Sequence, residues 1–184
     1  MNVSGEREFA APRATVWEVL NDPESMAKTM PGVESFDVHD DRHWTANVKI
    51  PRGLGGLKMK VDMEKVEERD LEFAKLAVKG NGVGAMMNME TSFTLSDGDG
   101  GSTAMAWSAE VKILGPVGSM GQRVLQPIVN QQVQHVLAAL DAQVQEAVAG
   151  GAEPATHGAE EGISPASPEA YEAEPEGPTT STED

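Results

Sequence analysis

The chain has 184 residues, a formal net charge of −16 and no cysteine, which excludes disulfides, thiolate-bound zinc and cysteine nucleophiles. So acidic a chain, with no basic cluster in its sequence, is expected to repel nucleic acid and anionic lipid headgroups, and we expect no nucleic-acid partner. No apolar run reaches the roughly 20 residues that span a bilayer, and MNVSGEREF lacks the pattern of a signal peptide, so we expect a cytoplasmic protein.

The first predicted elements are one strand and two short helices. Residues 2–9 alternate polar and apolar side chains, as a strand with one wet face does. The segment 11–20 places Pro12 in a first helical turn and carries an apolar stripe. The segment 21–30 begins with a capping residue and Pro23, which predicts a second helix that Pro31-Gly32 ends.

Six more strands are predicted from alternating apolar and polar residues. Their ranges are 34–40, 43–50, 56–66, 71–80, 83–95 and 103–113. Turn-forming residues separate them, at 40–41, 53–56, 80–82 and 97–101. Alternation of this kind predicts an antiparallel sheet with one apolar face that needs a cover.

The segment 116–149 predicts the cover, a long helix. Apolar residues recur there at steps of three and four, namely Val133, Val136, Leu137, Leu140, Val144 and Ala147. Pro127 is expected to bend this helix or to restart it. The predicted fold class is therefore α+β: a curved antiparallel sheet of about seven strands around a long C-terminal helix, with two short helices after the first strand.

The composition changes at residue 150. Residues 150–184 hold nine acidic and no basic residues, so they carry −9 of the charge and residues 1–149 carry −16 + 9 = −7. Ile163 and Tyr171 are the only large apolar residues there, so we expect a disordered acidic tail. It either keeps the protein soluble or contacts a partner. Residues 1–149 are the predicted folded domain.

Several short motifs in this order resemble one protein family. They are F-x-A-P-x-x-x-V-W at Phe9–Trp17, N-D-P at 21–23, P-G at 31–32, a glycine-rich turn before the last strand, and G-x-x-G-Q-R at Gly118–Arg123. Together they resemble CoxG, a family of carbon monoxide dehydrogenase subunits within the START-like (SRPBCC) helix-grip superfamily. The resemblance covers residues 1–147.

The resemblance implies an apolar cavity between the sheet and the long helix. It implies an accessory protein of a molybdenum-containing carbon monoxide dehydrogenase or related hydroxylase, linked to membrane tethering and to respiratory quinone, either menaquinone or ubiquinone. Some relatives reach the membrane through an apolar or amphipathic C-terminal segment. This sequence ends TTSTED and departs from that pattern, so any contact with the inner face of the cell membrane is expected to be peripheral.

Methionine is concentrated on the predicted apolar faces. Met86, Met87 and Met89 fall within four positions, and Met86 is expected to point away from the other two. Methionine adapts to irregular gaps in a core, and it equally suits a cavity for a flexible or planar apolar guest. The predicted ligand-binding residues are Met26, Met30, Trp44, Val48, Met59, Val61, Met63, Met87, Met89, Met105, Trp107, Met120, Val124 and Ile128.

The first half of the long helix has no formally charged residue between Val124 and Leu140, and it is rich in Gln and Asn. Amide groups bind carbonyl or hydroxyl oxygens without the desolvation cost of a full charge. They equally suit a solvated helix face, or a surface for a partner or a membrane.

Other polar groups point to no chemistry. The segment DVHDDRH at 37–43 has the residue types of a metal site, but a hairpin turn explains them, and no metal is expected. The glycines at 53–56 and 80–84 lack the Lys-Ser/Thr and the helix of a phosphate loop, and they more simply permit tight turns or close backbone approach. His135, Arg7 and Glu90 would matter for catalysis only if they met another titratable group in a cavity.

Three functions follow, in order of preference. The first is a non-catalytic protein that binds a hydrophobic ligand, a respiratory quinone or lipid, and serves the hydroxylase. The second is an assembly or tethering factor without a small-molecule ligand. The third is a cyclase-like enzyme of the same superfamily.

Overall fold

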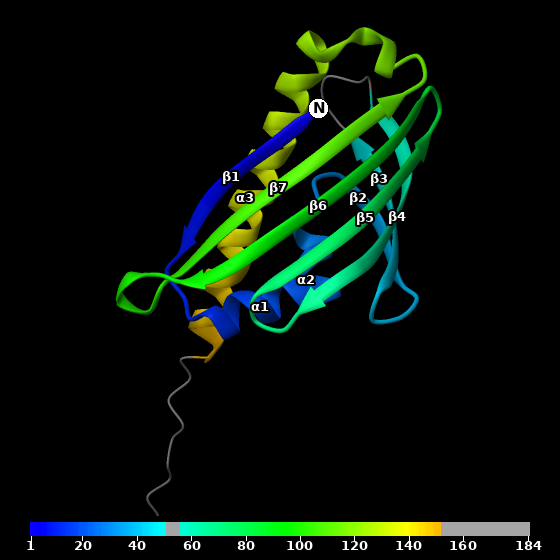
Figure 1. Ribbon diagram of the computed structural model, residues 1–184. Coiled ribbons are helices and arrows are strands. Elements are labelled where there is room, and N and C mark those ends of the chain that lie inside the picture. The colour runs from blue at the N-terminus through cyan, green and yellow to red at the C-terminus, as the bar shows by residue number, and fades with distance from the viewer. Residues whose placement is uncertain (51–55, 152–184) are drawn as a thin grey trace, which may run out of the picture. The chain divides into compact units, whose positions relative to one another are not determined.

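The computed structural model describes residues 1–50 and 56–151, in which one antiparallel sheet of seven strands curves around a long helix (Figure 1). The strands are β1 (Asn2–Phe9), β2 (Val33–Val38), β3 (His43–Ile50), β4 (Leu57–Arg69), β5 (Phe73–Gly82), β6 (Ala85–Asp97) and β7 (Thr103–Leu114). The helices are α1 (Arg13–Asn21), α2 (Pro23–Thr29) and α3 (Gln122–Gly151), with 3₁₀ turns η1 (Asp99–Gly101) and η2 (Gly118–Met120). The predicted architecture is confirmed.

The strand order is β1-β7-β6-β5-β4-β3-β2, and all neighbours are antiparallel. β1 and β2 are therefore the two edge strands. β4 runs three residues beyond its predicted end at Val66, to Arg69, because its ladder with β5 continues to the Arg69–Phe73 pair. Hydrogen bonds of the ladder do not need an apolar side chain, so alternation underestimates the strand's length.

α2 begins where the sequence predicts, whereas α1 begins at Arg13 and Pro12 is its extended N-cap residue, outside the first turn. The carboxylate of Asp22 accepts a hydrogen bond from the backbone N–H of Ser25 at 2.8 Å and so caps α2, with Pro23 at the first helical position. α3 continues through Pro127 as one helix, so the predicted alternative of a restart there is wrong. A proline removes a single backbone donor, and a helix of 30 residues retains the bonds on either side.

Two apolar clusters fill the space between the layers. The first joins β1, α1 and the second half of α3, around Phe9, Trp17, Leu140 and Val144. The second covers the concave face of β3–β6, the face turned toward the helices. α3 packs mainly on α1, α2, β1 and η2. It therefore covers more of the first apolar cluster than of the second.

Within residues 1–50 and 56–151, no helix combines the length and the apolar character needed to cross a bilayer. The predicted acidic tail, residues 150–184, lies outside the described residues from 152 onward. The predicted turn at 53–56 also lies outside the described residues, except for Gly56.

Candidate functional site

The concave face of β3–β6 carries a continuous apolar surface rich in methionine. Across the ladders, Val61 of β4 faces Gly80 of β5, which faces Met87 of β6. One row further, Met63 faces Val78, which faces Met89. Side chains of paired residues stand on the same side of a sheet, so the methionines of β4 and β6 point into one space.

Gly80 lets methionines from two strands meet over β5. A Cβ at position 80 would lie 2.8 Å from Cε of Met59 and 3.3 Å from Cβ of Met87. Any side chain there would displace these sulfur-bearing chains. The floor of the concave face is thus shaped by long flexible side chains. The turn predicted at 80–82 is wrong, because β5 continues to Gly82 and the turn lies at Val83 and Gly84.

This surface is incompletely covered. Ala46, Val61 and Val78 are buried, whereas Met63, Met87 and Met89 each remain partly exposed although they point toward the helices. Apolar surface left accessible on a concave face favours a guest that removes it from water.

A groove of about 430 Å³ lies between β1 and the first half of α3. Its lining residues are Asn2, Val3, Ser4, Trp107, Gln126, Asn130, Val133 and Gln134. None of them is ionisable, and three are amides of α3. The groove therefore offers hydrogen-bonding groups to a neutral polar head.

Trp107 supplies the most informative atom of this groove. Its indole Nε1 is buried and has no hydrogen-bond partner among the described residues. A buried donor without an acceptor costs free energy, so this N–H is a candidate donor to a ligand. The indole lies against Gly5, where a Cβ would come within 3.2 Å of Nε1.

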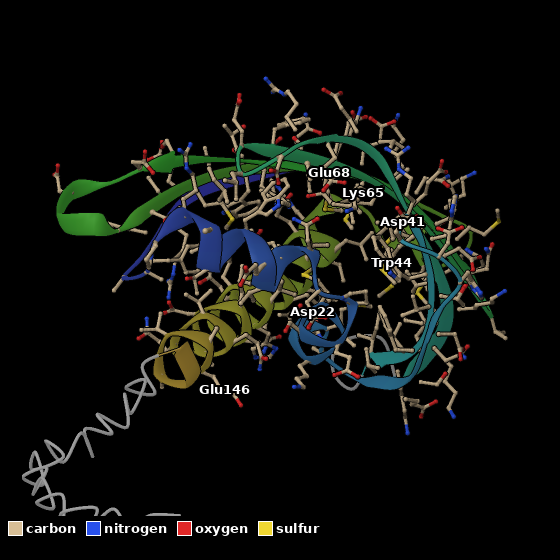
Figure 2. The ribbon with its side chains drawn as sticks, turned by 90° about the horizontal axis from the view of Figure 1, so that it is seen from below. Asp22, Asp41, Trp44, Lys65, Glu68 and Glu146 are labelled. Atoms are coloured by element: carbon tan, nitrogen blue, oxygen red, sulfur yellow. The ribbon has the colours of Figure 1, made fainter. Side chains whose placement is uncertain are left out.

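A second polar group in the interior is Lys65 of β4, which is 8% exposed. Its Nζ donates to Oδ1 of Asn21 at 2.9 Å and pairs with Oε2 of Glu68 at 2.8 Å. The ammonium also lies 6.0 Å from the ring centre of Trp44, whose Nε1 is buried without a partner in the described part of the chain. Figure 2 shows Trp44, Lys65 and Glu68 gathered along the curved sheet.

Lys65 was not predicted from the sequence, although the strand pattern contained the signal. Leu57, Met59, Val61 and Met63 alternate on the inward face, and the next inward position is Lys65. A lysine in the inward phase of an otherwise apolar strand indicates a buried charge that needs partners. The partner Asn21 is 44 residues away in the sequence.

The structure brings about half of the predicted ligand-binding residues together on one face. Those that belong to the second cluster are Met30, Val48, Met59, Val61, Met63, Met87 and Met89. Trp44 is paired with Met63 and lies beside them. Met105 belongs to the first cluster, and Trp107 packs against that cluster and lines the groove.

The remaining predicted residues lie on the helices and on η2. Met26 and Ile128 are partly buried on α2 and α3. Met120 and Val124 are 46% and 43% exposed at the start of α3, so they belong to the surface of the molecule and not to the concave face. Their helical spacing alone did not reveal that η2 turns them outward.

The polar residues considered for catalysis do not converge in the concave face. Glu90 pairs with Lys75 on the outer face at 2.9 Å, and this pairing lowers the pKa of Glu90 and raises the pKa of Lys75. Arg7 pairs with Asp141 at 2.6 Å, both about one-third exposed, which ties β1 to α3. His135 is exposed.

The acidic segment at 37–43 closes the β2–β3 hairpin. Asp40 accepts hydrogen bonds from the backbone N–H groups of Arg42 and His43, both at 2.8 Å. These bonds and one to the His43 ring lower the pKa of Asp40. A turn whose carboxylate is satisfied by its own backbone explains why Asp and His gather there.

A family model for CoxG, described as a carbon monoxide dehydrogenase subunit, matches residues 5–145. A comparison with curated proteins finds no significant match. Solved structures with the same fold include a conserved protein from Geobacillus kaustophilus, with 20% identity, a TM-score of 0.75, and 79% of this chain and 96% of that chain covered.

Two other solved structures share this fold. A START superfamily protein from Mycobacterium smegmatis has 16% identity and a TM-score of 0.62, with 79% of this chain and 97% of that chain covered. The Zhui aromatase/cyclase from Streptomyces sp. R1128 has 15% identity and a TM-score of 0.64, with 80% and 95% covered. At such identities the likeness shows the START-like fold alone.

Proposed function

The chain belongs to the CoxG family of carbon monoxide dehydrogenase subunits and has the START-like fold, and from this premise we propose that it is a non-catalytic accessory protein that binds a hydrophobic ligand. The partner is a molybdenum-containing carbon monoxide dehydrogenase or a related hydroxylase. The ligand is an isoprenoid quinone, and the protein links the enzyme to the quinone pool of the membrane.

The observation that carries the proposal is the partly exposed methionine surface on the concave face. Burying apolar area is worth about 25 cal/mol per Å², so covering three partly exposed methionines with an apolar chain is favourable by about 2–4 kcal/mol. Flexible thioethers adapt to a chain of isoprene units and to a planar ring.

The groove between β1 and α3 supports a ligand with a polar head. A quinone carbonyl accepts hydrogen bonds and carries no charge. The buried Nε1 of Trp107 lacks an acceptor among the described residues, and the amides of Gln126 and Asn130 line the same groove. A carbonyl placed there would satisfy the indole donor without bringing a charge out of water.

The test compares two adjacent methionines of β6. Met87 points into the concave face, whereas Met86 is 52% exposed on the other face. In a titration with a short-chain quinone, followed by tryptophan fluorescence, Met87→Gln is expected to weaken binding about tenfold and Met86→Gln to leave it unchanged. Equal affinity of both variants, or no binding by the wild type, would favour a tethering factor without a ligand.

A second candidate function, a cyclase-like enzyme, rests on one observation. Lys65 is a buried ammonium beside Trp44 and paired with Glu68, and buried lysines with a carboxylate partner occur in active sites. The likeness to an aromatase/cyclase concerns fold alone. Turnover of an aromatic or polyketide substrate by the wild type, lost in Lys65→Met, would support the enzyme.

A further inference from the structure

The methionines of the concave face differ in how far solvent reaches them. Met63, Met87 and Met89 are partly exposed. Met59 and Met105, which point to the same side of the sheet, are only 6% and 3% exposed. Exposure decides which thioethers a small dissolved reagent can reach. The structure therefore divides the methionines of this face into three accessible and two protected side chains.

The three accessible methionines share one patch. Met63 and Met89 flank Val78 in one cross-strand row, and Met87 stands two residues before Met89 on β6. The partner of Met87 on β5 is Gly80, which has no side chain that could cover it. Figure 2 shows sulfur atoms, drawn in yellow, on the inner side of the curved sheet. A reagent that enters the concave face therefore meets several thioethers together.

Thioethers are the sulfur groups on which a peroxide can act in this chain. The sequence contains ten methionines and no cysteine, so no thiol competes for the oxidant. Oxidation converts the flexible apolar side chain of methionine into a polar, chiral sulfoxide, and methionine sulfoxide reductases reverse the change. On a surface that binds apolar molecules, such a change alters what the surface can bind.

We propose that Met63, Met87 and Met89 form a reversible oxidation site that switches off the binding of apolar ligands to the concave face. Each thioether sulfur attacks one oxygen of hydrogen peroxide, so that a sulfur–oxygen bond forms and the oxygen–oxygen bond breaks. The departing hydroxide takes the proton of the transferred hydroxyl group and leaves as water. The sulfur is thereby oxidised by two electrons, and the peroxide is reduced to water.

The new sulfoxide oxygens stand on a surface that cannot satisfy them. Their neighbours on β5 are Val78 and Gly80, and neither residue has a side chain that donates a hydrogen bond. Water serves these oxygens while the face is empty. An apolar guest laid over them displaces that water and returns no hydrogen bond, which makes its binding less favourable.

This inference rests on the proposed function, because the ligand lost on oxidation is the one assigned to the concave face. The proposed ligand also gives the peroxide a source. A hydroquinone, the reduced form of a quinone, passes two electrons and two protons to dioxygen and yields the quinone and hydrogen peroxide. The oxidant then arises on the surface whose thioethers it modifies, and the modified surface releases the ligand.

Oxidation is mapped first, on the full chain treated with hydrogen peroxide and then digested for mass spectrometry. The three accessible methionines are expected to gain one oxygen each at least about fivefold faster than Met59 and Met105. Met86 and Met120, which are exposed outside the concave face, should also react. Equal rates in the accessible and the protected methionines of the concave face would overturn the proposal.

Binding is then followed with N-phenyl-1-naphthylamine, a neutral apolar dye whose fluorescence rises in apolar sites. Peroxide treatment is expected to lower the affinity of the wild type for the dye about tenfold, since polar groups are buried without partners. Methionine sulfoxide reductases A and B together should restore the affinity, because each enzyme reduces one epimer of the sulfoxide. An oxidised wild type that binds the dye as tightly as the untreated protein would contradict the switch.

Two variants, each compared with its own untreated sample, locate the effect. Met63→Leu with Met87→Leu and Met89→Leu keeps apolar side chains of similar volume, and its affinity for the dye should change less than about twofold on peroxide treatment. Met86→Leu with Met120→Leu removes the two exposed thioethers outside the concave face and should lose affinity as the wild type does. A loss in the triple variant as large as in the wild type would assign the effect to other methionines and reject the proposed site.

A titration with a short-chain quinone separates this proposal from the proposed function. If peroxide switches dye binding while no quinone binds, the oxidation site stands and the proposed ligand fails. If quinone binds equally well before and after oxidation of the three methionines, the switch alone is rejected. A wild type that binds neither dye nor quinone has no apolar site to switch, and both proposals are then rejected.

Discussion

The indole of Trp107 lies against the backbone of Gly5 across the β1–β7 ladder, so closely that a Cβ at position 5 would be 3.0 Å from Cζ2 of the ring. The edge strand therefore holds the ring in place beside the groove between β1 and α3, which Trp107 lines. The lack of a side chain at position 5 therefore affects both the stability of the fold and the binding of a ligand at Trp107.

Gly5→Val is expected to push the indole out of its position. The displaced ring should cost about 1–3 kcal/mol of unfolding free energy, since overpacking next to a rigid ring is destabilising. Urea unfolding measures the loss of stability, and the tryptophan emission maximum measures the displacement of the indole. Ser4→Val, on the exposed side of the same strand, should change neither, and an unaltered Gly5→Val would show that the ring has room to move.

Trp107→Phe removes a donor that has no partner among the described residues and retains most of the apolar ring. Without ligand, unfolding free energy should be unchanged or slightly higher, because a buried unsatisfied N–H is removed. Quinone affinity should fall about three- to tenfold, as expected for one neutral hydrogen bond. An unchanged quinone affinity in Trp107→Phe would contradict a head-group role for Trp107.

Lys65→Met is expected to lower the unfolding free energy by about 1–3 kcal/mol, because hydrogen bonds to a buried charge tie β4 to the end of α1. The loss of stability is limited because Glu68, which would be left without Lys65, is one-third exposed and can be solvated. Lys60→Met serves as the control, since the Lys60–Asp62 pair is exposed and 3.6 Å long, and it should change stability by less than about 0.5 kcal/mol. An equal loss of unfolding free energy in Lys65→Met and Lys60→Met would show that Lys65 does not hold β4 against α1.

Asp22→Ala should remove the cap of α2 and lower stability by about 1 kcal/mol at neutral pH. Hydrogen bonds from Ser25 lower the pKa of Asp22 below its ordinary value of 3.8. A lowered carboxyl pKa means that its contribution is fully present above pH 3.8 and is lost as the pH falls through the folded-state pKa. Asp22→Asn keeps a capping oxygen without titrating, so urea unfolding of this variant should lose that part of the acid sensitivity. Identical pH profiles of the wild type and Asp22→Asn would show that the Asp22 carboxylate does not contribute to the acid sensitivity.

Much of the fold could be predicted from the sequence because strand phase and helix caps are local. The alternation of Val83, Ala85, Met87 and Met89 placed Met86 on the opposite face, and its 52% exposure confirms that phase. Gly80 was instead predicted to lie in a turn at 80–82, whereas its ladders with β4 and β6 place it inside β5. Pro127 was misleading because a single missing donor does not decide the course of a long helix.

The interior polar groups and the charge pattern depend on pairing between distant residues. Lys65 meets Asn21 only after α1 packs against the sheet, and the charged side chains that share a row of the convex face are known only once the register is known. Composition showed an acidic chain and could not show that Lys79 and Lys112 stand in one row on either side of Asn88. Local patterns predict elements, whereas register and packing determine which side chains share a surface.

Occupancy of the concave face by a hydrophobic ligand is the property on which the proposed function depends. Native mass spectrometry of the full chain, purified without detergent, tests it most directly, together with solvent extraction and chromatography of whatever is bound. We expect one isoprenoid quinone per chain, reduced in Met87→Gln and retained in Met86→Gln. A wild-type protein that carries no ligand, and that takes up none when quinone is added, would show that the concave face does not serve this purpose.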